Sequence, residues 1–104
     1  MSANVLLVED EERMRQVIIM QLSDLDLHIY EAVDGEQAID TFENETIHLV
    51  ITDLKLPKVN GMEVLHAIKE KDPEIPVIVI TAYGSIENAV KAIQQGAFDY
   101  VTKP

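Results

Sequence analysis

The sequence predicts an α/β fold, in which helices cover both faces of a parallel β-sheet. Five short apolar runs alternate with amphipathic helical patterns along the 104 residues. This alternation is typical of strands joined by right-handed helical crossovers. The runs LLV, LVI and VIVI are apolar at consecutive positions, as expected for strands buried on both faces. The length suits a single domain spanning residues 1–104.

Three strands are expected in the first half of the chain, at Asn4–Val8, His28–Ala32 and Leu49–Thr52. A helix should follow the first strand, because apolar residues recur there at helical spacing. These residues are Met14, Val17, Ile18, Leu22 and Leu25. A turn at Asp34-Gly35 should begin a second helix. The residues expected on its inner face are Ala38, Ile39 and Phe42.

The second half continues the alternation. A loop with Pro57 and Asn60-Gly61 leads to a helix carrying Leu65 and Ile68, which Pro73 and Pro76 end. The fourth and fifth strands are expected at Val77–Ile80 and Phe98–Thr102. Between them, Ser85 can cap a helix that ends at Gly96. The apolar residues at helical spacing in that helix are Ile86, Ala89, Val90 and Ile93.

Composition excludes several classes of function. Nineteen acidic residues against eight basic ones give a net charge of −11. Direct nucleic-acid binding is therefore not expected, because it needs clustered Lys and Arg. The chain has no cysteine, so it can form neither a disulfide framework nor a thiolate metal site. It shows no signal peptide and no apolar run of the roughly 20 residues that a membrane span needs. A cytoplasmic location is expected.

Polar residues follow the apolar runs at the carboxyl ends of four strands. Ligands bind at that edge of an open parallel sheet. The residues are Glu9 and Asp10 after the first strand, Asp53 after the third, Thr81 after the fourth and Lys103 after the fifth. Any one of them alone is more often a turn or surface residue. Their joint placement indicates a site.

Three carboxylates brought together at one edge repel one another. Two like charges ~4 Å apart interact by about 4 kcal/mol at an effective dielectric near 20. Such crowding either keeps one carboxyl protonated or recruits a cation. Mg²⁺ usually binds one or two carboxylates together with water and phosphate oxygen. The pattern therefore indicates a Mg²⁺ site, or a Mn²⁺ site, with Lys103 and Thr81 available to phosphoryl oxygens and a carboxylate available as nucleophile.

The segments that carry this pattern resemble the receiver domains of two-component response regulators. They are VLLVEDEE, ITDLKLPKVNGME, the pair Thr81-Ala82 and the terminal Lys103-Pro104. The resemblance spans essentially the whole chain. It implies a flavodoxin-like, three-layer fold with strand order 2-1-3-4-5. It also implies a fifth helix beyond this sequence, so the domain is expected to be truncated after the fifth strand.

The resemblance implies a role for each site residue. Asp53 would accept a phosphoryl group from a phosphohistidine on a sensor histidine kinase. Asp10, Asp53 and the backbone carbonyl of Lys55 would bind Mg²⁺, and Glu9 would act through water. Thr81 and Lys103 would bind phosphoryl oxygens. The peptide bond before Pro104 would be cis, the form that proline makes accessible.

A switch is expected from the same resemblance. Phosphorylation would draw Thr81 and Lys103 toward Asp53, and Tyr100 would rotate inward, shifting the 85–95 helix. The segment TAYGSIENAVKAIQQGAFDYVTKP looks like the receivers of NtrC-type activators of σ54-dependent transcription, so the output would be transcription. Without the fifth helix, one sheet face should lose its cover, and either self-association as a homodimer or rearranged packing is expected.

Other readings remain open at this stage. The domain could act as a non-phosphorylated interaction module. It could be a phosphohydrolase with an aspartyl nucleophile, although such enzymes need a second acid where this chain has Lys55. A flavin-binding protein is disfavoured by the acidic loop after the first strand. The expectation is a phosphoacceptor that is not an enzyme, apart from slow self-dephosphorylation. Structural or surface roles are expected for His28, His48 and His66.

Overall fold

Five strands and four helices alternate along the chain in a computed structural model, which describes residues 3–56, 59–81 and 86–102. The strands are β1 (Ala3–Val8), β2 (Leu27–Ala32), β3 (Leu49–Asp53), β4 (Val77–Thr81) and β5 (Asp99–Thr102). The helices are α1 (Glu12–Gln21), α2 (Gly35–Asn44), α3 (Gly61–Lys71) and α4 (Ile86–Gln94). None of the helices in the described part of the chain is long and apolar enough to cross a membrane.

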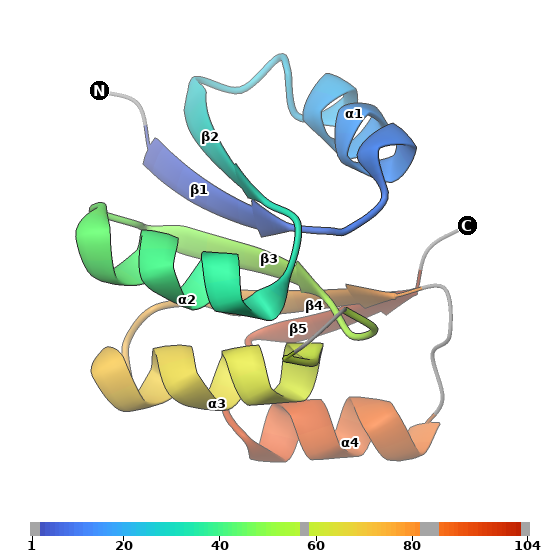
Figure 1. Ribbon diagram of the computed structural model, residues 1–104. Helices are drawn as coiled ribbons and strands as arrows, with labels where there is room; N and C mark the ends of the chain where they lie inside the picture. The colour runs from blue at the N-terminus through green and yellow to red at the C-terminus, as the bar shows by residue number, and fades with distance from the viewer. Residues whose placement is uncertain (1–2, 57–58, 82–85, 103–104) are drawn as a thin grey trace.

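The sheet is parallel throughout, and its strand order is β2-β1-β3-β4-β5. Helix α1 lies on one face, while α2, α3 and α4 lie on the other (Figure 1). The predicted fold class and strand order are therefore confirmed. Because all the strands run the same way, their carboxyl ends meet at one edge of the sheet.

The sheet separates two apolar cores. The larger lies beneath α2, α3 and α4 and includes Leu6, Val50, Leu65 and Ile68. The smaller lies beneath α1 and contains a short set of buried side chains, Val5, Leu7, Ile18 and Ile51. Adjacent residues of β1 and β3 therefore point into different cores. This arrangement explains why those two strands are apolar at consecutive positions.

Strand β4 differs from the prediction that it is buried on both faces. Its side chains alternate between buried and half-buried, with Ile78 and Ile80 on the half-buried side. Both belong to the face that carries α1, and Val101 of β5, beside Ile80 in the register, is exposed. The apolar pattern of β4 therefore exceeds its burial among the described residues.

Several helix expectations need correction. Helix α1 ends at Gln21, so Leu25 lies beyond it and is 59% exposed, and Val17 is exposed as well. The apolar residues at helical spacing in α4 are largely exposed, with Ile86 86% accessible. The buried residue of α4 is the small Ala92, whose methyl group allows a close approach to the sheet. Phe98 is exposed and precedes β5 rather than beginning it.

The expected end of α4 at Gly96 is confirmed. Gly96 has a φ of +103°, a left-handed conformation that favours glycine. The amide of Gly96 donates to the carbonyl of Ile93, and the amide of Ala97 donates to that of Ala92, as in a Schellman motif. The proposed cap Ser85 and the loop residue Pro57 lie outside the described residues.

Candidate functional site

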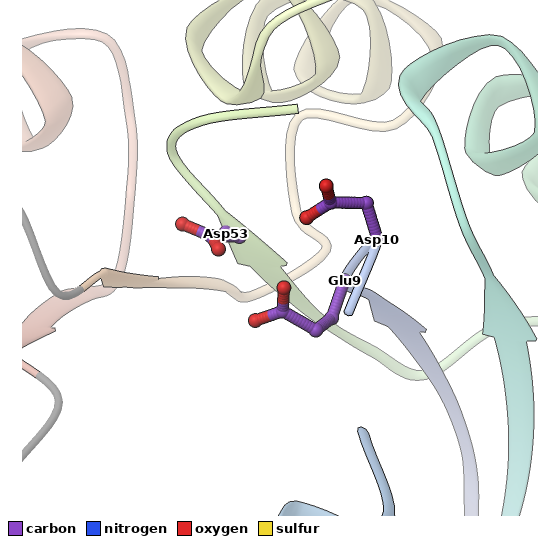
Figure 2. Close-up of side chains that lie close together, drawn as sticks. All are labelled: Glu9, Asp10 and Asp53. Atoms are coloured by element: carbon purple, nitrogen blue, oxygen red, sulfur yellow. The ribbon is translucent and has the colours of Figure 1, made fainter. Parts of the chain in front are cut away.

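The predicted site residues that the structure describes come together at the carboxyl edge of the sheet. Strand β1 pairs with β3 up to Val8 and Thr52, and β3 pairs with β4 up to Asp53 and Ile80. Glu9 and Asp10 therefore emerge beside Asp53, and Thr81 ends the next strand. Figure 2 shows the carboxylates of Glu9, Asp10 and Asp53 directed into one space.

These three carboxylates form a group that could hold a metal ion. One oxygen from each of Glu9, Asp10 and Asp53 lies within 4.8 Å of the other two. Glu9 is 2% exposed and Asp53 is 6% exposed, whereas Asp10 is exposed to solvent. Two buried acidic residues and one exposed acidic residue suit a hard cation that keeps part of its water shell. The donor set therefore fits Mg²⁺ or Mn²⁺.

The turn after β3 holds Asp53 by its backbone and side chain. The amide of Lys55 donates to Oδ1 of Asp53 over 3.2 Å, and the hydroxyl of Thr52 donates to the Asp53 carbonyl over 3.0 Å. Gly61, the first residue of α3, packs directly on this turn. A Cβ atom there would lie 2.1 Å from the Asp53 carbonyl oxygen. Only glycine lets α3 begin so close to Asp53.

Helix α3 begins at Gly61 because Asn60 caps it. The side chain of Asn60 accepts a hydrogen bond from the amide of Glu63, and this contact satisfies one of the unpaired donors of the first turn. The amide of Gly61 donates to the carbonyl of Leu54 over 2.8 Å. The Asn60-Gly61 pair was predicted to lie in the loop that leads to this helix, but the contact of Gly61 with the Asp53 backbone was not predicted.

Glu9 is anchored on several sides. Its amide donates to the carbonyl of Ala32 over 3.0 Å, and its carboxylate accepts from the amide of Glu11 over 3.2 Å. Its carbonyl accepts from Arg15 of α1 over 2.9 Å. Arg15 also pairs with Glu31 of β2 over 3.1 Å. Sequence reasoning missed Arg15, whose only signal is a basic residue within an acidic segment.

Thr81 and Tyr100 lie on the same face of neighbouring strands. Thr81 is fully buried at the end of β4, and Tyr100 pairs with Val79, two residues earlier. The Tyr100 ring packs against the larger core. Its hydroxyl is buried and finds no hydrogen-bond partner among the described residues. The Tyr100 ring therefore lies inward in this structure, and its expected rotation on phosphorylation stays a prediction.

The remaining candidates are residues outside the described part of the chain and the three histidines. Lys103 and Pro104 fall outside the described residues, as does Ala82. The histidines are not part of the acidic group. Nδ1 of His48 accepts from the amide of Asn4 near the start of β1, His66 pairs with Glu70, and His28 packs edge-on against Tyr30. The structural roles expected for the three histidines agree with these contacts.

Comparison with known sequences gives a family match over nearly the whole chain. Residues 5–104 match the model described as the response regulator receiver domain. The chain is 39% identical over 98 residues to the regulatory protein LuxO of Vibrio cholerae, and 41% identical over 105 residues to the response regulator protein FleR of Pseudomonas aeruginosa. These matches cover 94% and 100% of this chain but 22% of each relative. The chain thus spans about a fifth of the length of these relatives.

Solved structures show the same likeness. The signal receiver domain of a putative Luxo repressor protein from Vibrio parahaemolyticus has a TM-score of 0.94 and 38% identity, covering 100% of this chain and 80% of that one. NtrX from Brucella abortus has a TM-score of 0.91 and 36% identity, covering 100% of this chain and 24% of that one.

Proposed function

The chain belongs to the response regulator receiver family, and from this premise we propose that it is a phosphorylation-dependent switch in which Asp53 accepts a phosphoryl group from a sensor histidine kinase. The convergence of Glu9, Asp10 and Asp53 at one strand edge carries the proposal. Relatives of the chain are NtrC-type activators, in agreement with the resemblance of its C-terminal segment to them. The domain would act in the cytoplasm, as the sequence composition led us to expect.

Asp10 and Asp53 are the proposed direct ligands of Mg²⁺ or Mn²⁺, with the backbone carbonyl of Lys55 as a third and Glu9 acting through water. The fit of the three carboxylates to a hard cation supports this assignment. A bound cation would offset both the carboxylate charge and the charge of an incoming phosphoryl group. Asp10 is the exposed member of the group, so it lies where a cation would arrive from solvent.

In the proposed transfer, a carboxylate oxygen of Asp53 attacks the phosphorus of a phosphohistidine. A P–O bond forms, the P–N bond breaks, and the imidazole leaves with the electron pair and takes up a proton. The contacts from Lys55 and Thr52 hold Asp53 at the strand end, which supports its use as a positioned nucleophile. Thr81 and Lys103 are proposed to bind the phosphoryl oxygens, although Lys103 lies outside the described residues.

The proposed readout runs from Thr81 to Tyr100 and α4. The Tyr100 hydroxyl has no partner among the described residues, and leaving a buried hydroxyl unpaired costs about 1–3 kcal/mol. This cost would favour a second, solvated position of the ring. Phosphorylation adds about −1.5 to −2 charge and three acceptors. If Thr81 moves toward these acceptors, the space next to the Tyr100 ring changes. This change would favour one position of the ring and would move the exposed apolar residues of α4.

The downstream partner is proposed to be an output domain that controls transcription, since these matches cover only 22% of each relative. Neither nucleic acid nor membrane is a proposed partner of this domain.

Self-association as a homodimer is a further part of the proposal. The half-buried Ile78 and Ile80 and the exposed Val101 offer an apolar surface beside α1. Light scattering that shows only monomer at high concentration would contradict the dimer alone.

Intact-mass measurement after incubation with a small phosphodonor and Mg²⁺ tests the function. The wild type should gain one phosphoryl group, and this gain should disappear in Asp53→Asn and in the presence of a chelator. Asp24→Asn, which removes an equal charge at an exposed position, should retain it. No gain in any variant would favour a non-phosphorylated interaction module. Steady release of phosphate at enzyme-like rates would favour a phosphohydrolase, although Lys55 occupies the place of the second acid.

A further inference from the structure

Arg15 is a largely buried cation that joins three parts of the chain. Its side chain is 11% exposed. From its place on α1, Nη1 donates to the carbonyl oxygen of Glu9 over 2.9 Å, and Nε donates to the carboxylate of Glu31 over 3.1 Å. One guanidinium therefore links α1 to the turn after β1 and to the last part of β2. The planar fork of arginine suits two such acceptors at once.

The contact with Glu9 acts on the peptide that leads into Asp10. The carbonyl of Glu9 and the amide of Asp10 belong to one planar unit, so holding that carbonyl sets the direction in which Asp10 leaves the strand. The amide of Glu9 is held from the other side by the carbonyl of Ala32. Arg15 and β2 together fix both peptide groups of Glu9. These two contacts oppose the mutual repulsion of the carboxylates of Glu9, Asp10 and Asp53.

We propose that Arg15 is a positioning residue for the metal site, holding the Glu9–Asp10 peptide so that both carboxylates face Asp53 before a cation binds. The inference rests on the proposed function, because it assigns Arg15 to the cation site that the function requires. Arg15 does not touch the cation in this scheme. It acts through the Glu9 carbonyl, and the ion pair with Glu31 keeps its guanidinium in place.

Mn²⁺ alone is the probe, and its affinity for the 104-residue chain is read from the electron paramagnetic resonance signal of the free ion. Arg15→Gln should weaken Mn²⁺ binding by about 10-fold or more, as is typical when a residue that orients metal ligands is removed. Arg13→Gln is the matched control, because Arg13 lies on the same helix and is exposed. It should bind Mn²⁺ within about twofold of the wild type, since exposed charges are largely screened.

The sign of the effect separates positioning from simple charge. Removing a nearby cation should by itself make the site more attractive to Mn²⁺, whereas loss of positioning weakens binding. The inference is overturned if Arg15→Gln binds Mn²⁺ as tightly as Arg13→Gln or more tightly. The melting temperature of each variant in chelator shows whether it folds. If Arg15→Gln does not fold, Arg15→Lys serves as a second variant. Arg15→Lys should fold and bind Mn²⁺ roughly threefold more weakly than Arg13→Lys, because an ammonium group lacks the planar fork of donors of a guanidinium. Equal Mn²⁺ affinity of the two lysine variants would overturn the inference.

Failure of the proposed function gives a different result. If the wild-type chain neither binds Mn²⁺ at millimolar concentration nor gains a phosphoryl group, the function and the role of Arg15 fall together. If the wild type does both and Arg15→Gln is unimpaired, only the role of Arg15 is overturned. Glu31→Gln should weaken Mn²⁺ binding by less than about threefold, because Glu31 is the exposed partner of the ion pair and the contact of Arg15 with the Glu9 carbonyl remains.

Discussion

Replacing Asp53 with Asn should stabilise the metal-free domain. The substitution keeps the size and shape of the side chain but removes one of three charges whose oxygens lie within 4.8 Å of one another. At that separation, two carboxylates interact by about 3.5 kcal/mol at an effective dielectric near 20. Asp53 has two such neighbours, so the free energy of unfolding should rise when its charge is removed.

The gain is smaller than the sum of two pair energies. Asp10 is exposed, so solvent screens its share of the repulsion. The amide of Lys55 donates to Oδ1 of Asp53, and an asparagine oxygen accepts this hydrogen bond less strongly than a carboxylate does. Asp53 also has a further interaction, so we expect a net gain of about 2 kcal/mol rather than the full pair energies. For a domain of this size, that gain corresponds to a rise in melting temperature of roughly 10 °C.

Thermal unfolding followed by circular dichroism, at low salt and with a chelator, measures the gain. Asp24→Asn is the matched control for the change in net charge, and it should shift the melting temperature much less. Mg²⁺ should stabilise the wild type by about 2.7 kcal/mol when its concentration is 100 times the dissociation constant. Asp53→Asn should lose most of this response. An Asp53→Asn domain that melts no higher than Asp24→Asn in chelator would refute the electrostatic reasoning.

Three further substitutions test the surroundings of the site. Gly61→Ala places a Cβ atom 2.1 Å from the Asp53 carbonyl oxygen, so it should lower the free energy of unfolding by about 3 kcal/mol. It should also slow phosphorylation. Wild-type stability in urea unfolding, together with a wild-type rate of phosphorylation by intact mass, would contradict this close approach. Asn60→Ala removes the cap of α3 and should lower the free energy of unfolding by about 1 kcal/mol. Urea unfolding measures this loss, and an unchanged unfolding midpoint would contradict it. Tyr100→Phe deletes a buried hydroxyl that has no partner among the described residues, so the variant should be as stable as the wild type or up to about 1 kcal/mol more stable. A clear loss of stability in Tyr100→Phe would mean that the hydroxyl is satisfied.

Much of the site could be predicted without the structure, because it depends on topology. Glu9, Asp10 and Asp53 each follow an apolar run of strand length, and parallel strands bring their carboxyl ends to one edge. Local patterns of apolar residues therefore predicted both the fold class and the convergence of the three carboxylates. The turn chemistry at Gly96 was equally local, because a left-handed residue that ends a helix is usually glycine.

Other features depend on how elements distant in sequence pack together. The apolar residues of α4 recur at helical spacing, yet Ile86 is exposed and the buried residue is Ala92. Periodicity indicates which residues share a face, but it does not say which face meets the sheet. Leu25 fits the helical spacing of α1, and only the observed end of the helix at Gln21 places it outside.

The sequence alone determined which residues stand at the ends of the strands, since that depends on short-range order along the chain. Tertiary structure decided what holds them there. Arg15 reaches the Glu9 carbonyl and Glu31 only because α1 packs against β1 and β2, and Gly61 contacts the Asp53 carbonyl only because α3 begins against the end of β3. Such contacts depend on distances between elements that no local pattern encodes.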